Sequence, residues 1–314
     1  MLSEAFLTSP YDEKNTRRVA SSVVMVRPLD FGFNPSTAVD NDFQKPAQGQ
    51  SLASLALDEF ENFVGQLRQE GVRVDVFDPP APDLPDAVFP NNWLSTHPDG
   101  RVALYPMMAE NRRLERNPLI LDFLKGACEV SEVLDFSGFE THRQFLEGTG
   151  SLVFDIRFRR VYAAISSRTH KTLVVLVSRL LGYEPVIFET RHPGTGRPLY
   201  HTNVMLSVAP ECVVWIPDTV PDPGSRSELE AFLGAEGRKV VALPLSALDC
   251  FGANVLILKG NEGPTLWASQ GAQPVLEAHL PPDLPRRFVP LSTLEQVGGG
   301  SLRCMVCENF LTFR

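Results

Sequence analysis

Near the end of the sequence lies the stretch Gly298-Gly299-Gly300-Ser301-Leu302-Arg303-Cys304-Met305. Three consecutive glycines allow the backbone to adopt left-handed conformations and to pass close to a ligand. A thiol follows beside an arginine, and a neighbouring cation lowers the pKa of a cysteine and favours the nucleophilic thiolate. The stretch therefore predicts a glycine loop that presents Cys304 as a nucleophile. From these residues alone, the alternative is a turn in which Cys304 and Cys307 are small buried hydrophobic side chains.

Composition places the chain among globular proteins with a large core. Of 314 residues, 38 are acidic and 29 basic, and the net charge of −9 argues against nucleic acid or an anionic membrane as a partner. No run approaches the roughly 20 apolar residues of a membrane span, and the N-terminus lacks the basic-then-apolar order of a signal peptide. Five thinly spread cysteines suit a reducing compartment. We therefore expect a cytoplasmic enzyme or binding protein.

Strand and helix patterns alternate along the chain after a polar N-terminal tail, residues 1–20. The alternation recurs without a flexible linker, and it predicts a single α/β domain over residues 21–314. Gly148-Thr149-Gly150 lacks the third glycine of a dinucleotide-binding fingerprint and is expected to be a turn. Strands are predicted at residues 21–27, 72–77, 102–105, 130–135, 152–155, 161–165, 184–189, 204–208, 212–216, 239–243, 255–259, 265–268, 287–290 and 304–310, and helices at 51–69, 111–125, 170–181, 225–233, 272–278 and 291–297.

Four further clusters place polar side chains beside turns. Glu147 stands at the edge of the glycine turn, and His201 stands where a strand is predicted to begin. Arg112 opens a predicted helix, and Arg168 follows a predicted strand. Taken singly, each residue also fits an ordinary structural role. Glu147 could be a solvated residue of a turn, His201 a histidine at the edge of a strand, and the arginines part of a solvent-exposed helix surface.

Taken together, these clusters resemble a known set of motifs. Leu146-Glu147-Gly148, His201-Thr202-Asn203 and the Gly-Gly-Gly-Ser-x-Arg-Cys-Met stretch are similar to those of the guanidino-group-modifying superfamily, which contains arginine deiminases, dimethylarginine hydrolases and amidinotransferases. The blocks Val26-Arg27-Pro28 and Phe89-Pro90-Asn91-Asn92-Trp93 resemble the amidinotransferase-like branch that includes citrulline-utilisation hydrolases. The resemblance implies a five-bladed α/β propeller, or pentein, built from ββαβ modules around an axial active-site cavity.

The resemblance also implies a role for each matching residue. Cys304 is expected to be the nucleophile, with Cys307 as the second candidate, His201 the general acid and base, and Glu147 the carboxylate that orients the imidazole. A thiolate attacks an sp² carbon flanked by nitrogens, and the histidine protonates the departing amine and then activates water. Arg112 and Arg168 are expected to bind the α-carboxylate of the substrate, which a guanidinium can hold bidentately.

Two positions depart from the arginine-processing relatives. Those relatives hold the cationic guanidinium with carboxylates where this chain has Asn92 and Asn203. An amide keeps the shape and hydrogen bonding of a carboxylate but removes its charge, and an uncompensated guanidinium in a closed site is costly. The substitutions favour a neutral ureido group, unless another acid such as Asp86 or Asp155 holds a guanidinium instead.

The sequence therefore predicts a cysteine-dependent hydrolase of a ureido or guanidino C–N bond, most simply one that converts L-citrulline to ornithine, carbon dioxide and ammonia. Arginine deiminase or amidinotransferase activity is the alternative, and a non-catalytic pentein binding protein is a further one. We expect no cofactor, because the histidines are widely spaced and Cys304 and Cys307 lack a second cysteine pair for a zinc site. The expected partner is a citrulline-like small molecule rather than nucleic acid or a membrane, and the sequence leaves homo-oligomerisation open.

Overall fold

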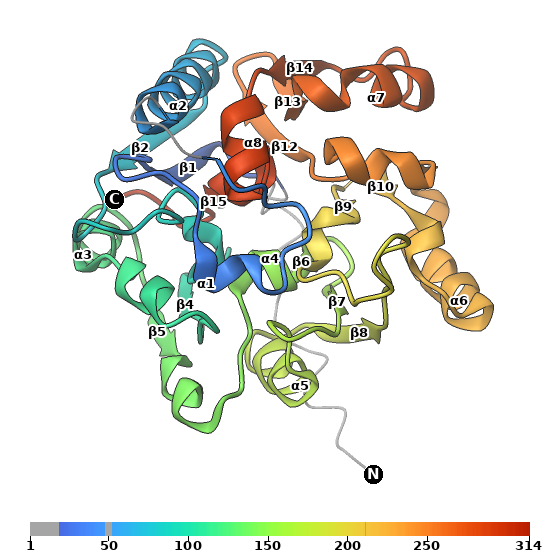
Figure 1. Cartoon of the computed structure of the whole chain (residues 1–314), viewed down its shortest axis with the longest axis horizontal. Helices are drawn as coiled ribbons and strands as arrows, with labels where there is room; N and C mark the ends of the chain where they lie inside the picture. Colours follow the sequence, from blue (N-terminus) through green and yellow to red (C-terminus); the bar gives the residue numbers. More distant parts are fainter. Residues whose placement is uncertain (1–18, 48–51, 211) are drawn as a thin grey trace.

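The computed structural model describes residues 19–47, 52–210 and 212–314. The predicted N-terminal tail lies outside the described residues except for Val19 and Ala20. Within the described part, the strands form five separate three-stranded sheets, and the predicted α/β class is confirmed. Figure 1 shows these sheets arranged around a common centre, with α2, α3, α5, α6 and α7 on the outside.

The secondary structure follows the predicted alternation closely. The strands are β1 (Ser22–Val26), β2 (Arg73–Phe77), β3 (Leu94–Thr96), β4 (Arg101–Leu104), β5 (Glu132–Asp135), β6 (Val153–Asp155), β7 (Arg160–Ala164), β8 (Glu184–Phe188), β9 (Leu206–Val208), β10 (Cys212–Trp215), β11 (Lys239–Ala242), β12 (Leu256–Gly260), β13 (Gly263–Ser269), β14 (Arg286–Val289) and β15 (Cys307–Glu308). The α-helices are α1 (Pro35–Ala38), α2 (Leu52–Gln69), α3 (Pro118–Ala127), α4 (Gly148–Ser151), α5 (Lys171–Leu180), α6 (Pro223–Leu233), α7 (Gln273–His279) and α8 (Ser292–Gly298).

All five sheets repeat one pairing pattern. The central strand pairs antiparallel with one neighbour and parallel with the other, as β4 does with β3 and β5. A parallel pair requires a crossover connection, and a helix supplies it, for example α3 between β4 and β5. Four sheets are built from consecutive strand–strand–helix–strand segments, and the fifth joins β15 to β1 and β2. The pairing of Val24 with Cys307 therefore ties the C-terminal segment to the first described strand.

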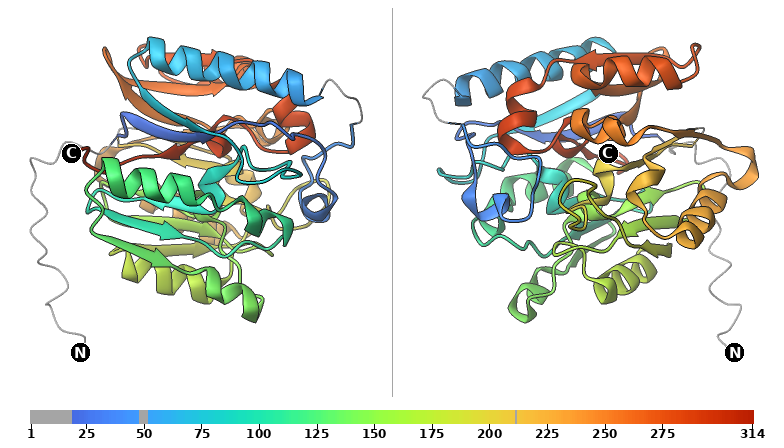
Figure 2. Two further views of the ribbon diagram at one scale, coloured as in Figure 1. Left: turned by 90° about the vertical axis from the view of Figure 1, so that its left-hand side faces the viewer. Right: turned by 45° about the vertical axis from the view of Figure 1, so that its right-hand side comes forward.

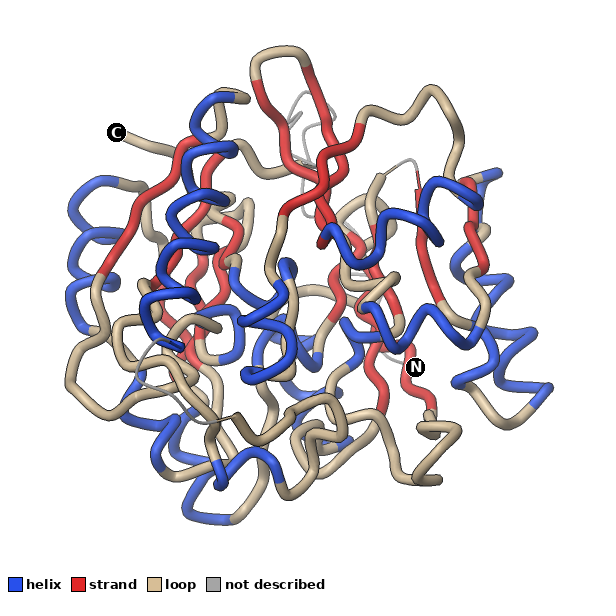
Figure 3. The backbone as a smooth tube through the Cα atoms, turned by 45° about the horizontal axis from the view of Figure 1, so that its top comes forward, coloured by secondary structure: helices blue, strands red, loops and turns tan. Residues whose placement is uncertain are grey.

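The outer helices bury one face against the sheets. In α2 the buried side chains include Phe60, Phe63, Val64 and Leu67, and the spacing of three and four residues places them on one face. Phe63 contacts the buried ring of Trp267 on β13, with ring centroids 6.0 Å apart. Figure 2 shows α2 along one side of the molecule, and Figure 3 shows loops gathering at the lower edge of that view.

Several predicted elements differ from the structure. The helix expected over 111–125 is divided into a 3₁₀ helix, η3 (Asn111–Glu115), and α3. Pro118 starts α3 because it has no N–H to leave unpaired, and the side chain of Asn117 caps the helix by accepting from the Leu119 N–H at 3.0 Å. Gly148-Thr149-Gly150, expected to be a turn, lies in the one-turn helix α4.

The strand expected over 304–310 is also shorter than predicted. Residues 302–305 form the 3₁₀ helix η10 (Leu302–Met305), and only Cys307–Glu308 pair as a strand. The apolar residues of this stretch are buried both in the 3₁₀ helix and in the strand. The hydrophobic pattern alone therefore could not distinguish a strand from a buried helical turn.

A buried ion pair links β6 to the segment before β11. Asp155 accepts from Arg238 Nη1 at 2.5 Å, and both side chains are almost fully buried. We expect Asp155→Asn to lower the free energy of unfolding by about 3–5 kcal/mol, because it leaves a buried guanidinium without its counter-charge. Urea unfolding followed by circular dichroism measures this change.

The matched control is Asp99→Asn, which removes the same charge from the more exposed pair with Arg101. We expect a loss below about 1 kcal/mol there. Equal losses in the two variants would contradict a special contribution from the buried pair.

Candidate functional site

A cavity of about 270 Å³ lies among short helices that precede strands. Its walls include residues of η2 (Pro90–Asn92) and η10, and His201, which precedes η5 (Thr202–Val204). Five of the seven residues predicted for the site line this cavity, namely Asn92, Arg112, Arg168, His201 and Cys304. The other two, Glu147 and Asn203, are fully buried directly behind the wall, where they contact His201 and Cys304, respectively.

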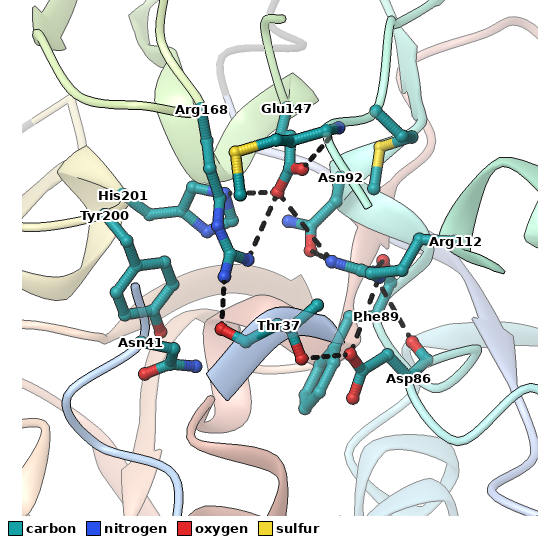
Figure 4. Close-up of polar contacts among 12 residues, drawn as sticks. Thr37, Asn41, Asp86, Phe89, Asn92, Arg112, Glu147, Arg168, Tyr200 and His201 are labelled. Atoms are coloured by element: carbon teal, nitrogen blue, oxygen red, sulfur yellow. Dashed lines mark hydrogen bonds and ion pairs between the residues drawn. The ribbon is translucent and has the colours of Figure 1, made fainter. Parts of the chain in front are cut away.

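Glu147 and His201 form the centre of the polar network (Figure 4). His201 Nε2 lies 2.8 Å from Glu147 Oε2, so Nε2 carries the proton and Nδ1 offers a lone pair. Burial favours the neutral form of both groups, but the charge of Arg168 and the hydrogen bond from His201 hold the pKa of Glu147 well below its usual range. Burial lowers the pKa of His201 despite its anionic partner. The pair is therefore a carboxylate and a neutral imidazole.

Arg112 reaches the same carboxylate from the other side (Figure 4). Its Nη1 lies 3.8 Å from Glu147 Oε2 and donates to Asn92 Oδ1 at 2.9 Å. Its Nε and Nη2 donate to Glu115, and burial raises the pKa of Glu115 to about 7 although Arg112 opposes that shift. Arg112 thus has protein partners along its whole guanidinium edge, and it fixes the orientation of the Asn92 amide.

Arg168 connects Glu147 to residues 37–44, the covering segment, in which Thr37, Asn41 and Gln44 line the cavity. Its Nη1 lies 3.5 Å from Glu147 Oε2, its Nη2 donates to the Thr37 carbonyl at 2.9 Å, and it forms an ion pair with Asp40. The covering segment is also held to the glycine run, because Asn41 donates to the Gly299 carbonyl at 3.1 Å. Arg168 thereby lies in the cavity wall, and its carboxylate-binding role stays a prediction.

Cys304 has amides rather than ions as its nearest polar partners. Asn254 Nδ2 lies 3.4 Å from the sulfur, and the thiol donates to Asn203 Oδ1 at 3.7 Å. Burial raises the pKa of the Cys304 thiol, although the Ser301 backbone and Asn254 act in the opposite direction. Arg303 lowers the pKa of the thiol, as expected, but burial has the larger effect and the net shift is upward. The guanidinium of Arg303 pairs instead with Glu308 at 2.8 Å.

Cys307 faces a different environment. It lies in β15 and borders a second cavity of about 980 Å³, which Arg303 also lines and which does not include Cys304 or His201. Burial and the nearby Glu308 raise the pKa of Cys307 to about 12. The geometry therefore separates the two candidate nucleophiles and places only Cys304 in the cavity that holds the imidazole.

Sequence reasoning missed several polar residues and left Asp86 as an alternative. Asp40 and Asn254 lie in stretches without a recognisable local motif, whereas Tyr200 directly precedes the His201-Thr202-Asn203 motif, and each reaches the site through a contact far along the chain. Asp86 lines the cavity, and its Oδ1 is buried without a hydrogen-bond partner in the part of the chain that the structure describes. Asp155, the other alternative acid, pairs with Arg238 and does not line this cavity.

The described residues offer neither a metal site nor a membrane-spanning helix. They contain no group of three or more His, Cys, Asp or Glu side chains placed to hold a metal ion. No helix among them is long and apolar enough to cross a membrane.

Gly150 allows the imidazole and Asn92 to approach α4 closely. A Cβ at this position would lie 2.7 Å from His201 Nδ1 and 2.8 Å from Asn92 Nδ2, inside the closest distances that real Cβ atoms show. We expect Gly150→Ala to lower kcat about 100-fold or more, because the imidazole must move and misplacements of about 1 Å are that costly. The steady-state rate of turnover measures the effect.

The control is Gly138→Ala, in a 3₁₀ helix where an added Cβ would meet nothing within 4 Å. That variant should keep wild-type activity. Wild-type activity in Gly150→Ala would show that His201 does not need its observed position.

Comparisons with known proteins identify a family for the chain. A sequence model of the family described as N,N dimethylarginine dimethylhydrolase, eukaryotic, matches residues 27–311. No curated protein sequence matches the chain.

Solved structures with low sequence identity share the fold. One is the apo structure of ArgZ, an arginine dihydrolase from the ornithine–ammonia cycle in cyanobacteria, with a TM-score of 0.72 and 19% identity. The match covers 91% of the present chain but only 40% of the ArgZ chain. An asparagine-to-serine variant of the ArgZ N-terminal domain, covalently bound to a reaction intermediate, has a TM-score of 0.70 and 18% identity, with coverages of 91% and 96%. DDAH from Pseudomonas aeruginosa, a cysteine-to-serine mutant in complex with citrulline, has a TM-score of 0.65 and 13% identity, with coverages of 92% and 99%.

Proposed function

The chain belongs to the N,N dimethylarginine dimethylhydrolase family, within the pentein superfamily of guanidino-group-modifying enzymes, and from this premise we propose that it hydrolyses the C–N bonds of a ureido group. L-citrulline is the simplest such substrate, and its products are ornithine, carbon dioxide and ammonia. The observation that carries the proposal is the surroundings of the Cys304 sulfur, whose polar contacts are the amides of Asn203 and Asn254. A neutral ureido group matches these neutral donors and acceptors.

In the proposed reaction, His201 takes the thiol proton on Nδ1 and the Cys304 sulfur attacks the ureido carbon. A C–S bond forms, and one C–N bond breaks as the imidazolium returns the proton to the departing nitrogen. Glu147 stabilises that imidazolium through the 2.8 Å hydrogen bond to Nε2. Water activated by the neutral imidazole then cleaves the C–S bond, and loss of carbon dioxide frees the second nitrogen.

The charged residues that line the cavity suit the charged end of an amino acid. We assign the α-carboxylate to Arg168 and Arg112, which line the wall, and its binding would replace part of the contacts that these guanidinium groups make with the protein. The unpartnered Oδ1 of Asp86 is the group placed to accept from the α-ammonium. Citrulline bound to DDAH from Pseudomonas aeruginosa supports the fit of a ureido amino acid to this fold.

A guanidino substrate is the second candidate. The likeness to an arginine dihydrolase and the free Asp86 oxygen in the wall favour it. Under this alternative, arginine deiminase or amidinotransferase chemistry would use the same Cys304 and His201. The two candidates differ in whether a cation must sit beside Asn92 and Asn203.

The proposal extends to the architecture. We infer that the five sheets are the blades of an α/β propeller with the cavity on its axis, and that residues 21–314 form one catalytic domain. The repeated strand–strand–helix–strand order and the arrangement in Figure 1 support this inference. We further propose a cytoplasmic protein that acts on a small molecule, in keeping with its charge and free cysteines.

Turnover tests the proposed reaction. We expect the purified protein to release ammonia and ornithine from citrulline and to leave arginine and agmatine largely unchanged. Cys304→Ser should lower the rate more than about 10³-fold, since the nucleophile is lost. Cys307→Ser is the matched control and should stay within about twofold of the wild-type rate, because its sulfur borders the other cavity.

Preferential turnover of arginine would replace the ureido substrate by the guanidino alternative. No turnover of any ureido or guanidino compound would favour a non-catalytic binding protein.

Affinity tests the selectivity. We expect Asn92→Asp combined with Asn203→Asp to shift the ratio of dissociation constants at least about tenfold from citrulline towards arginine, because two carboxylates supply the missing counter-charge. Calorimetry in the Cys304→Ser background measures binding without turnover. Asn62→Asp, which adds the same charge on the exposed face of α2, should leave the ratio unchanged. An unchanged ratio in the double variant would show that these two amides do not decide the charge of the substrate.

A further inference from the structure

Asn254 joins two segments that meet at the nucleophile. It is fully buried in the turn before β12, far from Cys304 along the chain. Its Oδ1 accepts from the Arg303 backbone N–H at 3.0 Å, and its Nδ2 donates to the Asn203 carbonyl at 2.9 Å. The same Nδ2 lies 3.4 Å from Cys304 Sγ. The Asn254 amide therefore contacts both the backbone and the sulfur of the nucleophile turn, which is η10 (Leu302–Met305).

The hydrogen bond from Asn254 to the Cys304 sulfur becomes stronger when the thiol loses its proton. A neutral thiol is a weak acceptor, whereas a hydrogen bond to an anion is charge-assisted and about twice as strong as a neutral one. In its thiol form Cys304 donates to Asn203 Oδ1 at 3.7 Å and to Asn254 Oδ1 at 3.8 Å, whereas the Nδ2 of Asn254 donates to the sulfur over the shorter distance of 3.4 Å. The N–H of Asn254 thus favours the thiolate over the thiol.

We propose that Asn254 is a positioning residue for the reaction: its amide fixes the nucleophile turn and stabilises the thiolate of Cys304 by donating to the sulfur. The proposal rests on the nucleophilic role proposed above for Cys304.

Other charged groups near the sulfur have partners of their own. Arg303, on the same turn, pairs with Glu308, and His201 already donates its Nε2 proton to Glu147. Tyr200 donates its hydroxyl proton to the Gly299 carbonyl at 2.6 Å. The remaining charged groups that line the cavity are Asp86, Arg112 and Arg168, and the two guanidinium groups pair with carboxylates of the network.

A second amide–thiol contact provides a matched control. Asn309 Nδ2 lies 3.8 Å from the sulfur of the buried Cys128, and neither residue lines the cavity. Asn309→Ala therefore removes an asparagine beside a buried thiol without touching Cys304.

The test is the pH profile of Cys304 alkylation by iodoacetamide in the full chain without substrate. The rate is followed between about pH 7 and about pH 10.5 by mass spectrometry of the peptide that carries Cys304. We expect Asn254→Ala and the isosteric Asn254→Asp to raise the midpoint by about 1 pH unit, equivalent to about 1.4 kcal/mol. At about pH 8 this shift makes alkylation about tenfold slower. Asn309→Ala should keep the wild-type midpoint.

An unchanged midpoint in folded Asn254 variants would overturn the proposal. Failure of both variants to fold would overturn it too, because the residue would then be structural only. The experiment needs no turnover, so its result is independent of the substrate. A shifted midpoint in a protein that hydrolyses neither citrulline nor arginine would defeat the proposed function and leave the role of Asn254 intact.

Discussion

The fully buried carboxylate of Glu147 is the constraint on which the site depends. A carboxylate without water must be compensated by hydrogen bonds and opposite charges. Glu147 obtains them from the His201 imidazole, the Met108 backbone N–H and the guanidinium groups of Arg112 and Arg168. These partners come from separate segments of the chain, so one desolvated charge fixes the relative positions of several loops.

The two arginines beside Glu147 are themselves paired with further carboxylates. Two guanidinium groups beside one carboxylate would leave excess positive charge, and Glu115 and Asp40 supply the balance. Asp40 belongs to the segment that covers the cavity, and Arg168 thereby connects that cover to Glu147. The cover, the imidazole and the cavity wall are consequently parts of one electrostatic network.

Much of this organisation was accessible from the sequence. Cys304, His201 and Glu147 stand in short motifs of glycine and polar residues, and the structure brings them to one place. The break between η3 and α3 was also accessible, because Asn117-Pro118 is a helix-start signal.

The remainder depends on long-range contacts. Asn254 and Asp40 reach the site across 50 and 128 positions of the chain, from stretches that carry no pattern of their own. The direction of the thiol pKa shift was inaccessible for the same reason. Local sequence showed Arg303 beside Cys304, whereas burial, a tertiary property, has the larger effect.

Under the proposed function, the charges in the cavity would have to suit a substrate with two unlike ends. Arg112, Arg168 and Asp86 line the cavity, and the amides of Asn203 and Asn254 contact the sulfur. The α-ammonium and α-carboxylate of an amino acid need opposite charges, whereas a ureido carbon needs a nucleophile in neutral surroundings. A carboxylate beside the sulfur would favour a cationic substrate, but it would also repel the thiolate and raise the pKa of the thiol further. Amides avoid that conflict, because they supply hydrogen bonds to the reacting group without adding charge.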